Sequence, residues 1–226
     1  MSRRIDNPLL SRPRRSCLYV PGANARALEK AKSLPADAFI LDLEDAVAPK
    51  AKADAREAIR NAVGDRAYGA REVLIRANGL ETEWGQDDLE MAASVGVDGV
   101  LVPKITSGDD ICVADQCLND AGAVPDLGLW AMIETPLAIL NIGEIAAASS
   151  DTRLTGFVIG TNDLAKELNA VPTADRRGFI FSLSAALAAA RAYHLAAIDG
   201  VCNDINNDEA LSAECEQGRV LSLIHI

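Results

Sequence analysis

Short apolar runs rich in β-branched residues recur along the chain, and longer segments with a helical repeat separate them. Such near-continuous apolar runs are typical of strands in a parallel sheet that is buried on both faces. The pattern predicts seven strands, over residues 16–20, 38–43, 72–77, 99–103, 129–133, 156–160 and 195–200. A weaker apolar run, VLSLIHI, stands at the end of the sequence.

The segments between these runs are rich in Ala, Leu, Glu, Lys and Arg and repeat their apolar positions with a helical period. The clearest predicted helices cover residues 24–34, 49–63, 84–96, 136–148 and 177–194. Pro49 stands where a first helical turn tolerates it. Ser107, followed three residues later by Asp110, predicts a helix start with a variant of the capping box.

Strand–helix alternation of this kind predicts a (β/α)8 TIM barrel, in which the final weak run supplies an incomplete or degenerate eighth strand. An open doubly wound sheet is the alternative. That fold usually carries a glycine-rich phosphate loop after its first strand, and neither G-x-G-x-x-G nor G-x-x-x-x-G-K-[ST] occurs in the sequence. We predict a basic N-terminal arm over residues 1–13 and one barrel domain over residues 14–226.

Charge and composition narrow the classes of partner. The 226 residues carry 22 basic and 33 acidic side chains, which gives a net charge of −11. This charge repels phosphate backbones and anionic lipids, so nucleic acid and membrane are disfavoured as partners. No apolar run approaches the roughly 20 residues that span a bilayer. The five cysteines show no C-x-x-C spacing, a usage typical of reduced thiols, and we expect a cytoplasmic protein.

Polar and charged side chains follow the ends of most predicted strands. The strand FILDL, for example, runs directly into two further carboxylates. Because the carboxyl ends of barrel strands form the active-site face, we expect these side chains to meet at one mouth. They are Glu44, Asp45, Arg76, Asn78, Lys104, Glu134, Thr135, Thr161, Asn162, Asp163, Asp199 and Asn203.

Two of these carboxylates, Glu134 and Asp163, follow neighbouring predicted strands. They predict a site for one Mg²⁺, an ion that prefers one or two carboxylates together with waters and substrate oxygens. No His lies near these strand ends and no cysteine pair is present, which disfavours zinc. Arg76 offers a fork of donors suited to a substrate carboxylate or a developing enolate oxygen.

Glu44 and Asp45 form a crowded acidic pair that is tolerable beside Arg76, Lys104 or a metal ion. There the pair orients these cations or holds a proton for transfer. An alternative interpretation of LDLEDA needs no chemistry. In that interpretation Asp42 points inward to a barrel cation, and Glu44 caps the next helix.

Six blocks of sequence, in order from about residue 14 to residue 220, closely resemble the HpcH/HpaI aldolase and citrate lyase family. The branch resembled is the citrate lyase beta-subunit-like proteins, which include malyl-CoA and citramalyl-CoA lyases. The blocks are RRSCLYVPGANARALEKA, DAFILDLEDAVAPKAKADAR, VLIRANG, GVLVPKI, AMIETPLAI and GTNDLAKEL. The resemblance implies a TIM barrel, Mg²⁺, a homo-oligomer (a trimer), and reversible carbon–carbon cleavage of a 3-hydroxyacyl thioester that carries a carboxylate.

The resemblance also implies roles for residues of the matching motifs. Glu134 of IET and Asp163 of TND resemble the metal ligands, with Glu134 also against the substrate, and Arg76 of LIRAN resembles the substrate-binding arginine. The remaining roles belong to residues just before the first strand, in LEDA and in VPK. The supporting acidic pair near the metal waters is Glu44 and Asp45, and the further contacts to an anionic substrate are Arg15 and Lys104.

The resembled chemistry predicts a Mg²⁺-dependent lyase that makes or breaks the bond between a 2-oxo acid and acetyl-CoA or a similar acyl-CoA. Hydrolysis of a malyl-CoA-type thioester by the same metal site stays open, as do cleavage of a free 4-hydroxy-2-oxo acid and a non-catalytic subunit. Lys104 leaves a Schiff-base mechanism open. Family members usually continue through an eighth strand of the type TLIHP and a C-terminal extension, so GRVLSLIHI predicts an abbreviated C-terminus.

Overall fold

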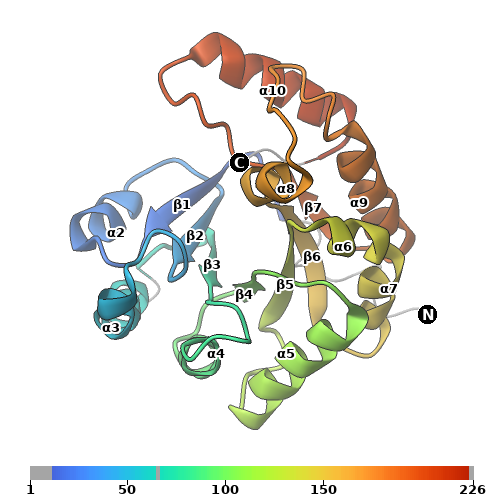
Figure 1. Cartoon of the computed structure of the whole chain (residues 1–226). Helices are drawn as coiled ribbons and strands as arrows, with labels where there is room; N and C mark the ends of the chain where they lie inside the picture. The colour runs from blue at the N-terminus through green and yellow to red at the C-terminus, as the bar shows by residue number, and fades with distance from the viewer. Residues whose placement is uncertain (1–11, 65–66, 224–226) are drawn as a thin grey trace.

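The computed structural model describes residues 12–64 and 67–223, and these contain one sheet of seven parallel strands in chain order (Figure 1). All seven predicted strands are confirmed at nearly their expected limits. The strands are β1 (Cys17–Pro21), β2 (Ala38–Asp42), β3 (Glu72–Arg76), β4 (Gly99–Val102), β5 (Gly128–Ile133), β6 (Leu154–Ile159) and β7 (Ala196–Ile198).

Helices connect successive strands and pack around the outside of the curled sheet (Figure 1). No helix among the described residues is long and apolar enough to cross a membrane. The α-helices are α2 (Ala25–Ala31), α3 (Lys52–Val63), α4 (Gly85–Ser94), α5 (Gly108–Asp120), α6 (Pro136–Leu140), α7 (Ile142–Ala147), α8 (Thr161–Leu168), α9 (Ile180–Ala192) and α10 (Asp208–Val220). The described residues also form the short 3-10 helices η1 (Pro49–Ala51) and η3 (Ala148–Ser150).

The helices follow the predicted pattern with local exceptions. The capping box before α5 is confirmed, because Ser107 and Asp110 each accept the backbone N–H of the other. Residues 136–148, expected as one helix, form α6 and α7 with a break at Asn141. Helix α10 was not expected: within it Gly218 alone is buried, so the sequence lacks the apolar stripe that predicts a packed helix.

Side chains alternate along the strands between two cores. Outward residues such as Phe39 and Leu41 pack beneath the helices, whereas inward residues such as Ile40 and Trp130 fill the inside of the curled sheet. Trp130 requires glycine at position 156 of the neighbouring strand, because a Cβ on Gly156 would lie 2.4 Å from the indole ring. At the carboxyl ends of the strands the inward positions become polar.

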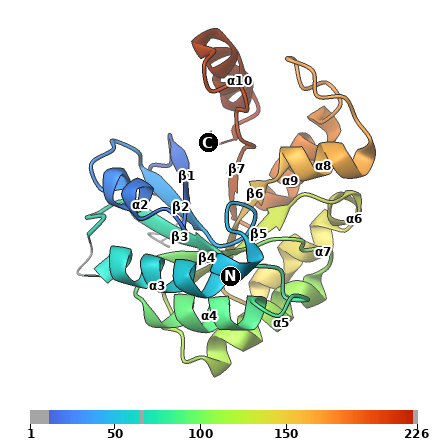
Figure 2. The ribbon, with the colours of Figure 1, turned by 60° about the vertical axis from the view of Figure 1, so that its left-hand side comes forward.

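The sheet curls towards a barrel without closing. Within the described residues β1 pairs with β2 alone and β7 with β6 alone (Figure 2). The expected eighth strand is replaced over its first residues, because Val220 completes α10 and residues 221–223 lie in or after a turn. Its last residues, 224–226, and most of the expected N-terminal arm, residues 1–11, lie outside the described residues. The TIM-barrel class is confirmed, and the expectation of an eighth strand is corrected over 220–223.

Candidate active site

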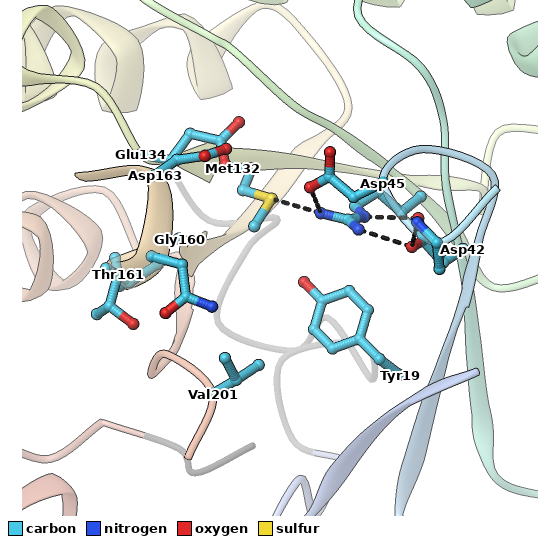
Figure 3. A pocket seen from close by; sticks show the side chains of 13 residues that line it. Tyr19, Asp42, Asp45, Met132, Glu134, Gly160, Thr161, Asp163 and Val201 are labelled. Atoms are coloured by element: carbon cyan, nitrogen blue, oxygen red, sulfur yellow. Dashed lines mark hydrogen bonds and ion pairs between the residues drawn. The ribbon is translucent and has the colours of Figure 1, made fainter. Parts of the chain in front are cut away.

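A cavity of about 390 Å³ opens at the carboxyl-terminal edge of the sheet (Figure 3). Its walls come from the ends of β1, β2, β3, β5 and β6 and from the start of α8. Six of the residues expected at the mouth line it, namely Asp45, Arg76, Glu134, Thr161, Asn162 and Asp163. Segments that are far apart in the sequence therefore converge on one pocket, as expected for the mouth of a parallel barrel.

Arg76 is held in place by Asp42. The two residues stand directly opposite each other in the register of β2 and β3. Nε and Nη2 of Arg76 donate to the two carboxylate oxygens of Asp42, each at 2.7 Å, and both side chains are buried. The alternative interpretation of LDLEDA is therefore right about Asp42. It is wrong about Glu44, because the helix starts at η1 and α3 have no side-chain cap.

The remaining guanidinium nitrogen of Arg76 faces two further carboxyl groups. Its Nη1 lies 2.9 Å from Glu44 Oε2 and 3.5 Å from Asp45 Oδ2. Burial raises the pKa of Glu44 to about 8, and the charge of Arg76 lowers it only in part because Asp42 already matches that charge. Asp45 differs from Glu44 in that its side chain is 70% exposed at the mouth. The predicted acidic pair thus divides into a half-buried carboxyl group with a raised pKa and a solvent-exposed carboxylate.

Glu134 and Asp163 meet around a single ammonium group. Nζ of Lys104 lies 3.4 Å from Glu134 Oε1 and forms a closer ion pair with Asp163 Oδ2. The backbone N–H of Lys104 donates to Glu134 Oε1 at 2.8 Å, and it reaches that oxygen from a left-handed backbone with φ of 57°. Burial raises the pKa of Glu134 in spite of this hydrogen bond. The two carboxyl groups therefore lie close enough to share one cation.

The surroundings of this pair fit a divalent ion. Oε2 of Glu134 is buried and has no hydrogen-bond partner among the described residues, so it lacks the partner that buried polar atoms require. Gly160 leaves room beside it, because a Cβ on Gly160 would lie 2.7 Å from Glu134 Oε2. Within the part of the chain that the structure describes, no three or more His, Cys, Asp or Glu side chains are grouped for a metal ion. Two carboxylates completed by waters and substrate oxygens suit Mg²⁺.

Lys104 and Arg15, both expected to contact the substrate, lie at opposite ends of the sheet. Lys104 follows β4 at the carboxyl edge. Burial disfavours its charge, but the hydrogen bond and charges of Asp163 and Glu134 outweigh burial and raise the pKa of Lys104. It is thus a cation rather than the neutral amine that a Schiff base needs.

Arg15 precedes β1 at the amino-terminal edge. Its guanidinium, 83% exposed, pairs with Asp37 at 2.8 Å. Arg15 therefore does not line the cavity, and its contact with the substrate stays a prediction. The residue before a barrel strand stands at the end of the strand that faces away from the active-site mouth.

Other polar residues after the strands serve the framework. Thr135 caps α6, Asn78 hydrogen-bonds to Asp88 of α4, and Asp199 pairs with a buried arginine. Asn162 and Asn203 exchange side-chain hydrogen bonds at 3.1 and 2.8 Å, which ties the start of α8 to the loop after β7. These residues therefore fix the helices and loops around the mouth of the cavity.

Among the pocket residues that sequence reasoning missed, Tyr19 and Met132 contact Arg76. Sδ of Met132 lies 3.8 Å from Arg76 Nη1, and the Tyr19 ring lies against the guanidinium, whose Cζ is 5.1 Å from the ring centre (Figure 3). The strand alternation holds the signal that finds them. Tyr19 shares the inward side of Cys17, and Met132 stands two residues before Glu134.

Comparison with known proteins places this pocket in context. The family model for HpcH/HpaI aldolase/citrate lyase matches residues 15–223. The (3S)-malyl-CoA thioesterase of Cereibacter sphaeroides (strain ATCC 17025 / ATH 2.4.3) is 48% identical over 207 residues, which cover 92% of this chain and 70% of the relative. Citrate lyase subunit beta of Escherichia coli (strain K12) is 35% identical over 212 residues, covering 90% of this chain and 68% of the relative.

Solved structures agree with the family model. The citrate lyase beta subunit from Mycobacterium tuberculosis, complexed with oxaloacetate and magnesium, superposes with a TM-score of 0.78 at 27% identity, covering 96% of this chain and 91% of that one. Protein CitE from the same organism, in complex with magnesium, acetoacetate and coenzyme A, has a TM-score of 0.75 at 27% identity, over 92% of this chain and 73% of that one.

Proposed function

Because the chain belongs to the HpcH/HpaI aldolase/citrate lyase family, we propose that it is a Mg²⁺-dependent enzyme acting on a carboxylated 3-hydroxyacyl-CoA. The substrate is of the malyl-, citramalyl- or citryl-CoA type, and the reaction splits it into a 2-oxo acid and acetyl-CoA or a similar thioester. The observation that carries the proposal is the convergence of Glu134 and Asp163 on one cation, with Arg76 in the same pocket.

Glu134 and Asp163 are the residues that would hold the metal. When bound, Mg²⁺ supplies a Lewis acid that favours ionisation of the substrate hydroxyl. The support from this chain is the donor set itself, since one oxygen of Glu134 is buried without a hydrogen-bond partner among the described residues. The magnesium in the Mycobacterium tuberculosis structures supports the same ion.

Arg76 supplies the second pole of the pocket. Asp42 does not bind Nη1, so this nitrogen can donate to a substrate oxygen on which negative charge grows. Asp42 keeps the guanidinium oriented, so little reorganisation is needed when the charge appears. This arrangement serves the departing enolate of a carbon–carbon cleavage.

Glu44 supplies a site for a proton. Its raised pKa, about 8, and its contact with Arg76 make it a group that accepts or releases a proton near neutral pH. Asp45, at the exposed mouth, balances the charge of Arg76 where the substrate enters. Lys104 contributes a positive charge next to the metal ligands, where an anionic substrate also binds.

Thioester hydrolysis is the second candidate, and one observation favours it. The relatives that are 48% identical carry the name (3S)-malyl-CoA thioesterase, whereas the citrate lyase subunits are 30–35% identical. The same pocket serves both reactions, because a hydrolytic enzyme also needs a cation for the substrate oxygens and donors for the developing oxyanion. The two candidates differ in which bond of one substrate breaks.

Incubation of the purified protein with malyl-CoA and Mg²⁺ tests both candidates. Glyoxylate with acetyl-CoA identifies the lyase, and malate with free CoA identifies the thioesterase. Glu134→Gln and Asp163→Asn should remove either activity, while Asp151→Asn, an exposed carboxylate in the turn before β6, serves as the matched control. Binding of the CoA ester without either product would instead identify a non-catalytic subunit. Gel filtration of the same sample tests the predicted homo-oligomer.

A further inference from the structure

Tyr19 is a half-buried residue whose hydroxyl the proposed chemistry has not used. Its hydroxyl oxygen is buried and has no hydrogen-bond partner among the described residues. The side chain lines the cavity, and its hydroxyl points into it (Figure 3). A buried hydroxyl without a partner is costly, so such a group in a pocket indicates a partner that arrives with the ligand.

The chain offers an internal comparison in Tyr68. That tyrosine is buried as a whole, and its hydroxyl donates to the backbone carbonyl of Leu28 at 3.1 Å. The fold therefore satisfies one buried phenol and leaves the other facing the cavity. Burial raises the pKa of Tyr19, so its hydroxyl keeps its proton and stays a donor at neutral pH.

The pocket has two poles, and Tyr19 belongs to the second. Glu134 and Asp163 form the cation pole, which takes the hydroxyl and carboxylate oxygens of the proposed substrate. Arg76 and Tyr19 form the donor pole, where the guanidinium carbon lies 5.1 Å from the phenol ring centre. The acceptor left for the donor pole is the thioester carbonyl oxygen. Negative charge grows on this oxygen in cleavage and in hydrolysis alike.

We infer that the Tyr19 hydroxyl binds the thioester carbonyl oxygen of the substrate and, together with Arg76, stabilises the charge that develops there. This inference rests on the proposed function and extends it to a residue that the family comparison does not assign. It makes Tyr19 a selector for substrates with an acceptor oxygen at the acyl end. The loss caused by its removal should fall on kcat more than on KM, because the oxygen becomes a stronger acceptor in the transition state.

A pair of tyrosine-to-phenylalanine variants tests the inference. Tyr19→Phe should lower kcat/KM for malyl-CoA about 100-fold, with glyoxylate and malate both assayed. It should leave Tm equal to that of the wild type or raise it, because it removes a buried hydroxyl that has no partner in the fold. Tyr68→Phe should do the reverse, with unchanged kcat/KM and a Tm lowered by about 2–4 °C.

Each outcome has one meaning. Tyr19→Phe with activity within twofold of an active wild type overturns the inference and leaves the proposed function standing. Tyr19→Phe that loses activity and thermal stability together assigns a structural role to the hydroxyl and also overturns the inference. If the wild type yields neither set of products from malyl-, citramalyl- or citryl-CoA, the proposed function fails, and the role of Tyr19 fails with it.

Discussion

The two edges of the sheet use the same chemical groups in opposite ways. At the amino-terminal edge Arg14 and Glu72 form a buried pair joined by two hydrogen bonds, and the guanidinium stacks on Trp130. One cation meets one carboxylate there. At the carboxyl-terminal edge Arg76 faces three carboxylates, and a buried oxygen of Glu134 has no hydrogen-bond partner among the described residues.

The difference separates stability from function within one sheet. A matched buried pair fixes the structure and leaves no demand for a ligand, and breaking it exposes an uncompensated charge to a low-dielectric interior. An unmatched cluster disfavours the free protein and is relieved when a cation or substrate binds. The amino edge is therefore expected to respond to mutation in stability, and the carboxyl edge in activity.

The largest expected effect comes from Glu134→Gln at the carboxyl edge. This change removes one charge of the proposed metal site and should lower Mg²⁺-dependent turnover of malyl-CoA about 10³-fold or more. The free energy of unfolding, measured by urea denaturation in EDTA, should stay the same or rise, because the raised pKa of Glu134 marks its ionised form as unfavourable. A variant that keeps full turnover would exclude Glu134 as a metal ligand.

The same substitution at the other edge, Glu72→Gln, should behave in the opposite way. It removes the charge of the carboxyl group that accepts two hydrogen bonds from the buried Arg14, and the free energy of unfolding should fall by about 3 kcal/mol. Turnover per folded molecule should match that of the wild type. Equal losses of activity in the two glutamine variants would contradict the division of stability and activity between the two edges.

Magnesium sharpens the comparison further. At about ten times its dissociation constant the ion should raise the Tm of the wild type by about 3–6 °C, because it binds the folded state alone. The Glu134→Gln variant should show no rise, and the Glu72→Gln variant should show the full rise from its lower starting Tm. Differential scanning fluorimetry with Mg²⁺ and with EDTA measures both. A full rise in Glu134→Gln would place the ion elsewhere.

Stability should also change with pH, with opposite signs at the two edges. The pKa of Glu44 is raised to about 8, so between pH 4.5 and 8 the folded state binds more protons than the unfolded state, and stability falls as pH rises, by at most about 1.4 kcal/mol per unit. The pKa of Asp37 is lowered to about 2 by the hydrogen bond from Arg15, so its contribution is lost as pH falls below 4.

Urea denaturation in EDTA across pH 3–9 checks this pair of slopes. Glu44→Gln should flatten the decline on the alkaline side, and Asp37→Asn should flatten the decline on the acid side. The Asp37 effect should be the weaker one, because its partner Arg15 is exposed and solvent screens the pair. A rise in wild-type stability between pH 5 and 8 would contradict the burial argument for Glu44.

Much of the fold was predictable because the strands are apolar on both sides and the helices carry apolar stripes. Helix α10 escaped prediction since its surface is almost wholly exposed, and the break at Asn141 escaped it since apolar residues continue through it. Sequence order placed Glu134 and Asp163 after neighbouring strands, and the structure brings them together. It could not show that Asp42 accepts hydrogen bonds from two nitrogens of Arg76, because that depends on the register between β2 and β3.

Hydroxyls such as that of Tyr19 were beyond sequence reasoning for a related reason. A tyrosine in an apolar strand predicts burial, but whether its oxygen finds an acceptor depends on backbone positions contributed by distant segments. Tyr68 finds a carbonyl of α2, and Tyr19 finds none in the described residues. Arg15 shows the converse case, since its charge suggested a ligand while its place before a strand set it at the opposite edge.

The facing positions of Asp42 and Arg76 have a consequence for assembly of the protein. A slip of one residue between β2 and β3 would turn one of the two side chains to the outer face and set a lone charge beneath a helix. The ion pair between Asp42 and Arg76 therefore favours the native register of the two strands. A chain that pairs them in another register also removes Arg76 from its place in the pocket. Molecules with the wrong register are therefore expected to be inactive rather than altered in substrate specificity.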